Sequence, residues 1–288
     1  MVDTPLGVSV LINDAHLNIL ISYYKAATKK LTSELNNVTD FGRASRISTL
    51  KQIDLILQEL DSKTTGWVQK EVEKYYTENA KEIALAMRSE GFPVAVSFGV
   101  IDKEAVKTLA DDIMAYYREA YSGVKRSALK MLNEAAKMRI TALLAEGKIS
   151  GDTRRTISDR IAGMLKEGFI ALIDKGGRRW NIEAYANMLT RTMLVRTANQ
   201  GIVNRLGSDG YDLVQVSDHM GECELCRPWE GKILSITGKH PEYQSVDTAY
   251  SSGEIFHPNC KHRLLPYHEK LSEVSAIYNP DTGRYINL

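Results

Sequence analysis

Apolar side chains recur every three or four residues over most of the first two-thirds of the chain. This spacing places them on one face of an α-helix, so it predicts a series of long amphipathic helices. Such helices pack on one another or on a partner. The stripes are built mainly from leucine, isoleucine, valine and tyrosine, and they run through residues 17–35, 47–60, 68–87, 106–117, 129–143, 157–169 and 182–206.

Glycines divide these stripes into separate predicted helices. Gly42 is expected to lie between the first helix and the second, and Gly91 is expected to end the third. Gly66 is a candidate kink between the second and third stripes. Gly123 is predicted to separate the helix that precedes it from a further one. The first half of the chain is therefore expected to contain several separate helices.

The segment 92–101 (FPVAVSFGVI) is an apolar break in this helical region. We interpret it as either a short strand or a buried connection. Asp102 follows it directly, with Glu104 two residues later. Aspartate is a preferred N-cap residue, and acidic side chains in the first turn interact favourably with the helix dipole. Asp102 is therefore predicted to cap the next helix.

The pattern changes after Gly207. Residues 213–217 alternate between apolar and polar positions and are rich in β-formers, as are residues 232–236, so both are predicted strands. Residues 238–253 are polar and typical of a loop. The predicted fold class is mainly α, with long amphipathic helices followed by a small α+β C-terminal module. The predicted organisation is a helical region 1–120, a basic helical region 121–210, the α+β module 211–270 and an extended tail 271–288.

Charge is distributed unevenly along the chain. The 288 residues carry a net charge of +1, which by itself indicates nothing about partners. Residues 1–120 contain 14 Lys and Arg against 17 Asp and Glu, residues 121–206 contain 16 against 7, and residues 207–288 contain 7 against 12. A basic segment between two acidic ones predicts contact with a nucleic acid or an acidic protein surface. The alternative is an ordinary solvated helix face.

Seven basic residues are the candidates for such a contact. Four lie on the outward face of one predicted helix and three near the start of the next, where the helix dipole disfavours cations. They are Lys125, Lys130, Lys137 and Arg139, followed by Arg154, Arg155 and Arg160.

The most specific chemical signal lies between Asp218 and Pro266. This stretch contains all three cysteines of the chain and four of its six histidines. The spacing is Cys-x2-Cys, then 30 residues, then His-x2-Cys-x-His. Two short turns of this kind bring zinc ligands together from separate segments. In the second turn, Pro258 fixes the backbone and Asn259 tolerates unusual backbone angles.

This pattern predicts a closed structural zinc site with three cysteines and one histidine. It also leaves alternatives open, because Cys-x2-Cys occurs in redox pairs and disulfides, and the turns can be held by hydrogen bonds without a metal. His262 is the reserve fourth ligand, and His219 is a more distant one. The predicted ligands are Cys223, Cys226, His257 and Cys260.

Residues 177–267 together resemble a known family. The segments GRRWNIEAYANMLTRTMLVRTANQGIVNRL, YDLVQVSDHMGECELCRPWEGKILSITGK and IFHPNCKHRLLPY resemble the C-terminal half of phage minor capsid proteins, which are similar in turn to the Mu F-like minor head proteins of tailed phages. Relatives often carry HPNCRC where this chain has HPNCKH, so His262 stands in place of a cysteine. The helical N-terminal half carries no motif of its own.

The resemblance implies a virion component present in few copies at the portal vertex. It implies roles in head assembly and in DNA packaging or ejection, with the portal protein and other head proteins as partners and non-specific contacts to packaged DNA. It implies no enzymatic activity. We expect the chain to fold in the reducing host cytoplasm, because it shows no secretory signal, no membrane span and no disulfide framework.

Two other functions compete with this one. His219, His257, Asn259 and His262 suggest an HNH-like metal-dependent nuclease, although three of these residues lie within six positions rather than across a hairpin and a helix. The basic middle region suggests a zinc-bearing nucleic-acid-binding protein, although no recognition helix with a compact basic face is evident. No nucleophile motif or phosphate-binding glycine loop is present, so we predict that the chain is not an enzyme.

Overall fold

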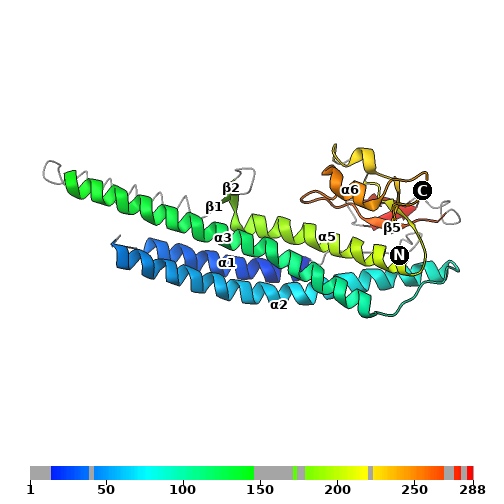
Figure 1. The fold of residues 1–288 in the computed structure, drawn as a ribbon, viewed down its shortest axis with the longest axis horizontal. Helices are drawn as coiled ribbons and strands as arrows, with labels where there is room; N and C mark the ends of the chain where they lie inside the picture. The colour runs from blue at the N-terminus through cyan, green and yellow to red at the C-terminus, as the bar shows by residue number, and fades with distance from the viewer. Residues whose placement is uncertain are drawn as a thin grey trace. The chain divides into compact units, whose positions relative to one another are not determined.

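Four long helices dominate the fold (Figure 1). The structure is a computed structural model that describes residues 14–38, 42–145, 171–173, 179–219, 223–268, 276–279 and 284–287. The long helices are α1 (Asp14–Asn36), α2 (Arg43–Ser89), α3 (Val100–Ala145) and α5 (Ile182–Ser208), and the short ones are η1 (Arg227–Trp229) and α6 (Val246–Ser252). The predicted mainly α fold with a small C-terminal α+β module is confirmed.

The strands of the described residues are short, and those that pair with one another do so in antiparallel fashion. β1 (Ala171–Ile173) pairs with β2 (Arg179–Asn181), and β6 (Ala276–Asn279) pairs with β7 (Arg284–Asn287). The third sheet has the order β4-β3-β5 and contains β3 (Leu213–Val216), β4 (Ile233–Ser235) and β5 (Leu264–Pro266). Its register sets Val214 opposite both Leu234 and Pro266. The two strands predicted from the sequence at residues 213–217 and 232–236 are confirmed.

Helices α2 and α3 are longer than the sequence pattern predicts. α2 continues through Gly66 over 47 residues, and α3 continues through Gly123 over 46 residues. The helix boundary expected at Gly123 is therefore wrong, whereas the kink expected at Gly66 stays a prediction. A glycine within a helix costs only about 1 kcal/mol relative to alanine. Buried neighbours on both helices, Val68 and Val124 among them, stabilise the continuous form.

The start of α3 also differs from its prediction. Residues 92–99 form an irregular connection in which Val94 is buried, so the strand interpretation of this segment is wrong. α3 begins at Val100, which makes Asp102 the third residue of the helix rather than its N-cap. Its carboxylate still satisfies a terminal donor, because Gly99 N–H donates to Asp102 Oδ2 over 2.8 Å.

The chain divides into two compact units, and α2 and α3 contribute residues to both. One unit contains the described parts of Val68–Asp111 and Met188–Leu288, and the other contains those of Ala15–Trp67 and Asp112–Asn187. The four-part division expected from the sequence stays a prediction. None of the helices in the described part of the chain combines the length and the apolar character needed to cross a lipid bilayer.

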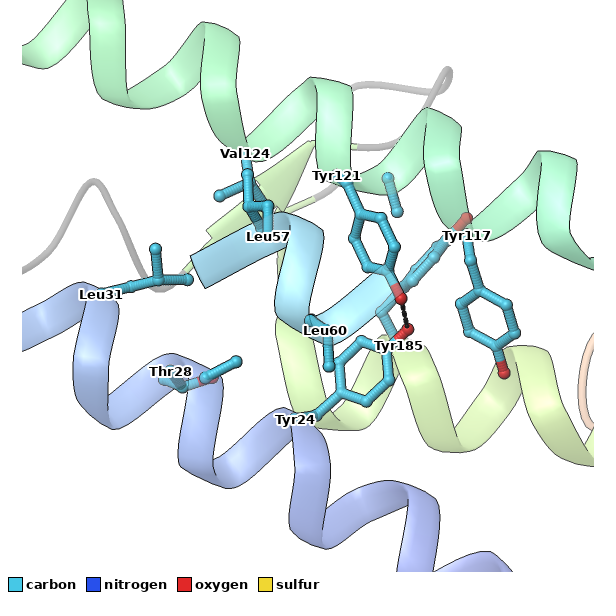
Figure 2. Close-up of a pocket in the computed structure, with 11 residues that line it drawn as sticks. Tyr24, Thr28, Leu31, Leu57, Leu60, Tyr117, Tyr121, Val124 and Tyr185 are labelled. Atoms are coloured by element: carbon cyan, nitrogen blue, oxygen red, sulfur yellow. Dashed lines mark hydrogen bonds between the residues drawn. The ribbon is translucent and has the colours of Figure 1, made fainter. Parts of the chain in front are cut away.

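The unit of residues 15–67 and 112–187 is a helical bundle with tyrosines in its core. Tyr24 of α1 and Tyr121 of α3 share a hydrogen bond of 2.7 Å between their hydroxyls, and Tyr121 Oη donates to Thr64 Oγ1 of α2 over 2.9 Å. Figure 2 shows these rings beside a small pocket lined by apolar side chains such as Leu31 and Leu60. The hydroxyl chain connects three helices in an otherwise apolar interior.

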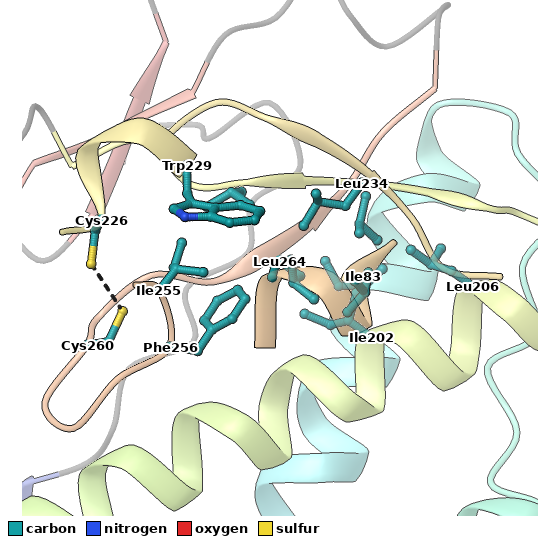
Figure 3. Close-up of a cluster of buried hydrophobic side chains, with 14 of the residues drawn as sticks. Ile83, Ile202, Leu206, Cys226, Trp229, Leu234, Ile255, Phe256, Cys260 and Leu264 are labelled. Atoms are coloured by element: carbon teal, nitrogen blue, oxygen red, sulfur yellow. Dashed lines mark hydrogen bonds between the residues drawn. The ribbon is translucent and has the colours of Figure 1, made fainter. Parts of the chain in front are cut away.

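The other unit has one continuous core shared by helices and sheet (Figure 3). Ile83 of α2 and Ile202 and Leu206 of α5 pack in the same cluster as Leu234 and Leu264 of the sheet. The small sheet therefore does not form its core alone, because the ends of two long helices supply much of the apolar surface that covers it.

Candidate metal centre

The first ligand-bearing turn runs from Cys223 into η1. Arg227 N–H donates to Cys223 O over 2.9 Å, and Trp229 N–H donates to Cys226 O over 2.8 Å. Pro228 in the first turn of η1 suits a helix start, because its missing N–H would have no helical partner there. These bonds hold Cys223 and Cys226 at the two ends of one tight turn.

The second turn runs from His257 to Cys260. Cys260 N–H donates to His257 O over 2.9 Å, which closes the turn. Asn259 has a φ of +65°, in the left-handed region that asparagine tolerates, so the role predicted for it is confirmed. Phe256 has a φ of +55°, which is unusual for a large side chain. Its buried ring, packed in the shared core, stabilises that backbone.

Helix α5 and the residue that follows strand β3 anchor the second turn and the segment after it. Asn259 N–H donates to Thr192 Oγ1 over 3.1 Å, and Leu264 N–H donates to Asn199 Oδ1 over 3.1 Å. Both acceptors lie on α5. On the sheet side, Arg263 N–H donates to Ser217 Oγ over 2.8 Å. The turn thus has a fixed position relative to the helix on which it rests.

The two turns bring five candidate ligands together as two groups that share Cys226. The first group is Cys223, Cys226 and His257, and the second is Cys226, Cys260 and His262. Within each group the ligand atoms lie within 4.8 Å of one another. The five residues predicted as metal ligands therefore lie in two overlapping groups, which do not form one set of mutually close ligand atoms.

Within the two groups, the distances between pairs of ligand atoms are close to those expected for two ligands of one tetrahedral ion. Two thiolates on one zinc lie about 3.8 Å apart, and a thiolate and an imidazole nitrogen about 3.5 Å apart. Cys226 Sγ and Cys260 Sγ are separated by 3.8 Å, a contact visible in Figure 3. His257 Nε2 lies 3.4 Å from Cys223 Sγ and 3.1 Å from Cys226 Sγ, and His262 Nδ1 lies 3.4 Å from Cys260 Sγ. All three cysteines are free thiols.

Both histidines have their second ring nitrogen occupied. His257 Nδ1 lies 2.9 Å from Pro258 O, and His262 Nε2 lies 3.0 Å from Glu230 Oε1. A histidine that binds a metal usually donates its other N–H to a carbonyl or carboxylate in this way. His219 lies next to His262. The centroids of the two rings are 4.2 Å apart, and His219 Nε2 lies 3.0 Å from Ser217 Oγ. Its ring therefore packs against the ring of His262.

The protonation of the cysteines differs across the site. Hydrogen bonding from the backbone N–H of Cys226, aided by the His257 ring, lowers the pKa of the Cys223 thiol to about 7. Burial raises the pKa of both Cys226 and Cys260 above the usual value, and the neighbouring thiols contribute in the same direction for Cys226. Buried thiols of this kind become thiolates when a cation binds, so metal binding here releases protons.

The sequence pattern found the ligands but not their supporting residues. Glu230 lies four positions after Cys226, and Thr192 and Asn199 lie on a distant helix. None of them belongs to a motif, because an isolated Glu, Thr or Asn carries no spacing signal. Only the fold places these three residues beside the ligands or their turn.

The basic residues predicted to contact a partner are only partly described. Lys125 Nζ lies 2.5 Å from Asp54 Oδ1, and Lys130 Nζ lies 3.9 Å from Glu134 Oε1. Lys137 is exposed on α3, and Arg139 belongs to the same helix. The predictions for Arg154, Arg155 and Arg160, and for the helix that carries them, lie outside the described residues.

Comparison with known proteins identifies the family. The sequence model of the family described as phage minor capsid protein 2 matches residues 21–281. The chain belongs to this family. It is also similar to a structural protein of Lactococcus phage LL-H, with 21% identity over 277 residues that cover 93% of this chain and 72% of the relative. No solved structure matches. The likeness recognised in residues 177–267 therefore extends into the helical N-terminal half, where the sequence offered no motif.

Proposed function

We propose that this minor capsid protein acts at the portal vertex of a phage head and that one structural zinc ion holds its C-terminal module together. The family assignment supports a capsid role. The zinc proposal rests on one observation: residues 223–226 and 257–262 bring five candidate ligand side chains together in two groups that share Cys226. The module is a structural unit rather than a catalytic one.

The donor set favours zinc over harder cations. Sulfur and imidazole ligands select zinc among the common metals, whereas magnesium and calcium take oxygen ligands. The proposed ligands are the three thiolates of Cys223, Cys226 and Cys260 with one nitrogen from His257 or His262. Structural zinc contributes of order ~10 kcal/mol to the folding of small domains. A three-stranded sheet with short strands benefits from a cross-link of this strength.

The same set of ligand atoms supports a structural rather than a catalytic role for the proposed zinc ion. A catalytic zinc keeps one position open for water or substrate, whereas four protein ligands close the shell. We therefore expect no cleavage of plasmid DNA by the purified protein in the presence of magnesium. A metal-dependent cleavage that disappears in His219→Ala or His257→Ala would replace this proposal with the HNH-like nuclease.

Location at the portal vertex follows from the family resemblance and is tested in two ways. The protein should be present in purified virions, and it should co-purify with the portal protein when both are produced together. Its absence from virions, or a portal protein that purifies without it, would contradict this part of the proposal. The zinc site and the head location are independent, so either can fail alone.

Contact with packaged DNA is proposed for the exposed basic side chains of α3. Phosphate contacts are insensitive to sequence and weaken steeply with salt. The variant Lys130→Glu/Lys137→Glu should bind duplex DNA more weakly than wild type at low salt. Lys107→Glu is the matched control, because Lys107 is an exposed lysine near the start of the same helix. Equal binding by all three proteins would rule out this surface as the DNA contact.

A further inference from the structure

The segment of residues 259–264 carries the last two candidate ligands, and both of its ends are bonded to helix α5. At one end, Asn259 N–H donates to Thr192 Oγ1 over 3.1 Å. At the other end, Leu264 N–H donates to Asn199 Oδ1 over 3.1 Å. Each bond joins a backbone group of the segment to a side chain of the helix. The two bonds therefore fix the path of the chain that carries the ligands.

The two acceptors on α5 are separated by two turns of the helix. Thr192 and Asn199 are seven positions apart, so they lie on nearly the same face and about 10 Å apart along the helix axis. The backbone of a helix keeps this separation constant. Cys260 and His262 lie between the two bonded positions. Helix α5 thus sets how far the ligand-bearing segment is extended.

The hydroxyl of Thr192 is oriented by its own helix. Thr192 Oγ1 donates to Met188 O, one turn earlier, over 2.8 Å. A hydroxyl has a single hydrogen to donate, and its lone pairs then accept from other donors. The branched side chain of threonine also limits rotation about χ1. The acceptor that Asn259 N–H reaches is therefore held in place before the turn binds to it.

The bond from Asn259 acts on the backbone next to a ligand. Asn259 has a φ of +65°, a conformation that a free chain seldom populates. The bond to Thr192 favours this conformation, while Cys260 N–H closes the turn on His257 O over 2.9 Å. The thiol that follows is placed 3.8 Å from Cys226 Sγ. The distance between these two candidate ligands therefore depends on the backbone at position 259.

From these contacts we infer that Thr192 is a positioning residue of the proposed metal centre. Through Asn259, it holds the second turn where Cys260 faces Cys226, and it does not itself bind the ion. The inference rests on the proposed site and holds whichever histidine supplies the nitrogen ligand. In the metal-free protein, the bond raises the fraction of molecules whose turn already has the binding conformation, and metal affinity rises with that fraction.

Thr192→Val tests the inference in the full-length protein. Valine keeps the branched shape of threonine but cannot accept the bond from Asn259. Zinc affinity, measured by competition with a chelator, should fall about 3- to 10-fold, as expected for the loss of one hydrogen bond. Thr192→Ser keeps the hydroxyl and should bind zinc as tightly as the wild type.

Thr197→Val is the matched control for this measurement. Thr197 lies on the same helix, and its Oγ1 donates to Met193 O over 2.9 Å in the same local pattern. This variant loses a bond within α5 but should keep the zinc affinity of the wild type. Unchanged affinity in Thr192→Val, an equal fall in Thr197→Val, or no recovery in Thr192→Ser would overturn the inference. Failure of the wild-type protein to bind zinc would instead remove the metal centre itself.

Discussion

At the scale of single residues, Gly201 fixes how closely two helices approach. A Cβ atom at this position of α5 would lie 2.6 Å from the carbonyl oxygen of Tyr76 on α2. Real Cβ atoms do not come this close to a backbone oxygen, so any side chain here forces the helices apart. The sequence does not indicate this role, because a glycine within an amphipathic helical pattern indicates only a lower helix propensity.

Replacing Gly201 with alanine should therefore destabilise the protein despite the better helix propensity of alanine. We expect a loss of about 1–3 kcal/mol from overpacking, measured by urea unfolding. Gly123→Ala is the control, since its Cβ would meet only Arg126 Nη2 at 3.9 Å. That variant should gain up to about 1 kcal/mol. Similar stability changes in the two variants would contradict the close-contact explanation.

Asp102 is the second residue whose role depends on its surroundings. Its Oδ2 lies 3.2 Å from Arg205 Nη2, and the side chains of the pair are only 11% and 8% exposed. Its Oδ1 accepts from Tyr76 Oη over 3.1 Å. The same arginine donates to Ser97 O over 2.7 Å. One carboxylate thus connects α3 to α2 and α5.

Asp102→Asn should destabilise the protein by about 3–5 kcal/mol, because the Arg205 charge would stay buried without its partner. Thermal unfolding at neutral pH measures the effect. Asp111→Asn removes the carboxylate of an exposed pair with Lys107 on the same helix. It should change stability by less than about 0.5 kcal/mol. Comparable losses of stability in both variants would show that burial does not determine how much an ion pair contributes to the stability of the protein.

At the scale of elements, three helices are joined by the buried hydroxyls of Tyr24, Tyr121 and Thr64. Burial raises the pKa of Tyr121 to about 12 and that of Tyr24 well above its usual value. The folded protein therefore favours the neutral phenols more strongly than the unfolded chain does. This preference makes the bundle sensitive to alkaline pH.

A raised tyrosine pKa stabilises the folded state fully below the unfolded pKa of about 10. That contribution is lost as the pH rises toward about 12. For Tyr121 it amounts to about 2–3 kcal/mol. Urea unfolding between neutral and strongly alkaline pH should show the decline. Tyr121→Phe should be less stable at neutral pH but show a shallower decline, whereas an unchanged slope would contradict the assignment.

Packing between elements explains which helix boundaries could be predicted from the sequence. α5 ends at Ser208, beside Gly207, as the pattern indicates, whereas α1 ends at Asn36, six positions before Gly42. Gly66 and Gly123 carry the same local signal, yet the helices continue through them. The difference is that buried side chains before and after each glycine pack against other helices. Local propensity of about 1 kcal/mol is too small to oppose that packing.

At the scale of the whole molecule, the two turns that carry the candidate ligands pack in the same hydrophobic core as parts of α2 and α5. Cys226 and Cys260 belong to the same buried cluster as Ile83 of α2 and Ile202 of α5. The helical bundle of residues 15–67 and 112–187 has its own core. Metal removal should therefore affect one unit strongly and the other weakly.

Chelation of the proposed metal ion should accelerate amide hydrogen exchange in residues 211–268 while leaving residues 43–67 protected. Loss of the proposed cross-link exposes the short strands to local unfolding, and the bundle keeps its packing. Mass spectrometry of peptides from both regions provides the measurement. Cys223→Ser should show the same exchange pattern without chelator. A metal-free protein with a fully protected module would contradict the structural role of the ion.

The sequence by itself determined the helical character, the strands β3 and β4 of the module and the identity of the five metal-ligand candidates. These follow from short-range features, namely apolar periodicity and the spacing of Cys and His, which are present in any conformation of the chain. Only the tertiary structure decided that α2 and α5 complete the core of the small sheet, that Asp102 pairs with Arg205, and that Glu230 faces His262. Each of these joins residues far apart in sequence or without a motif, and such contacts depend on how the chain folds back on itself.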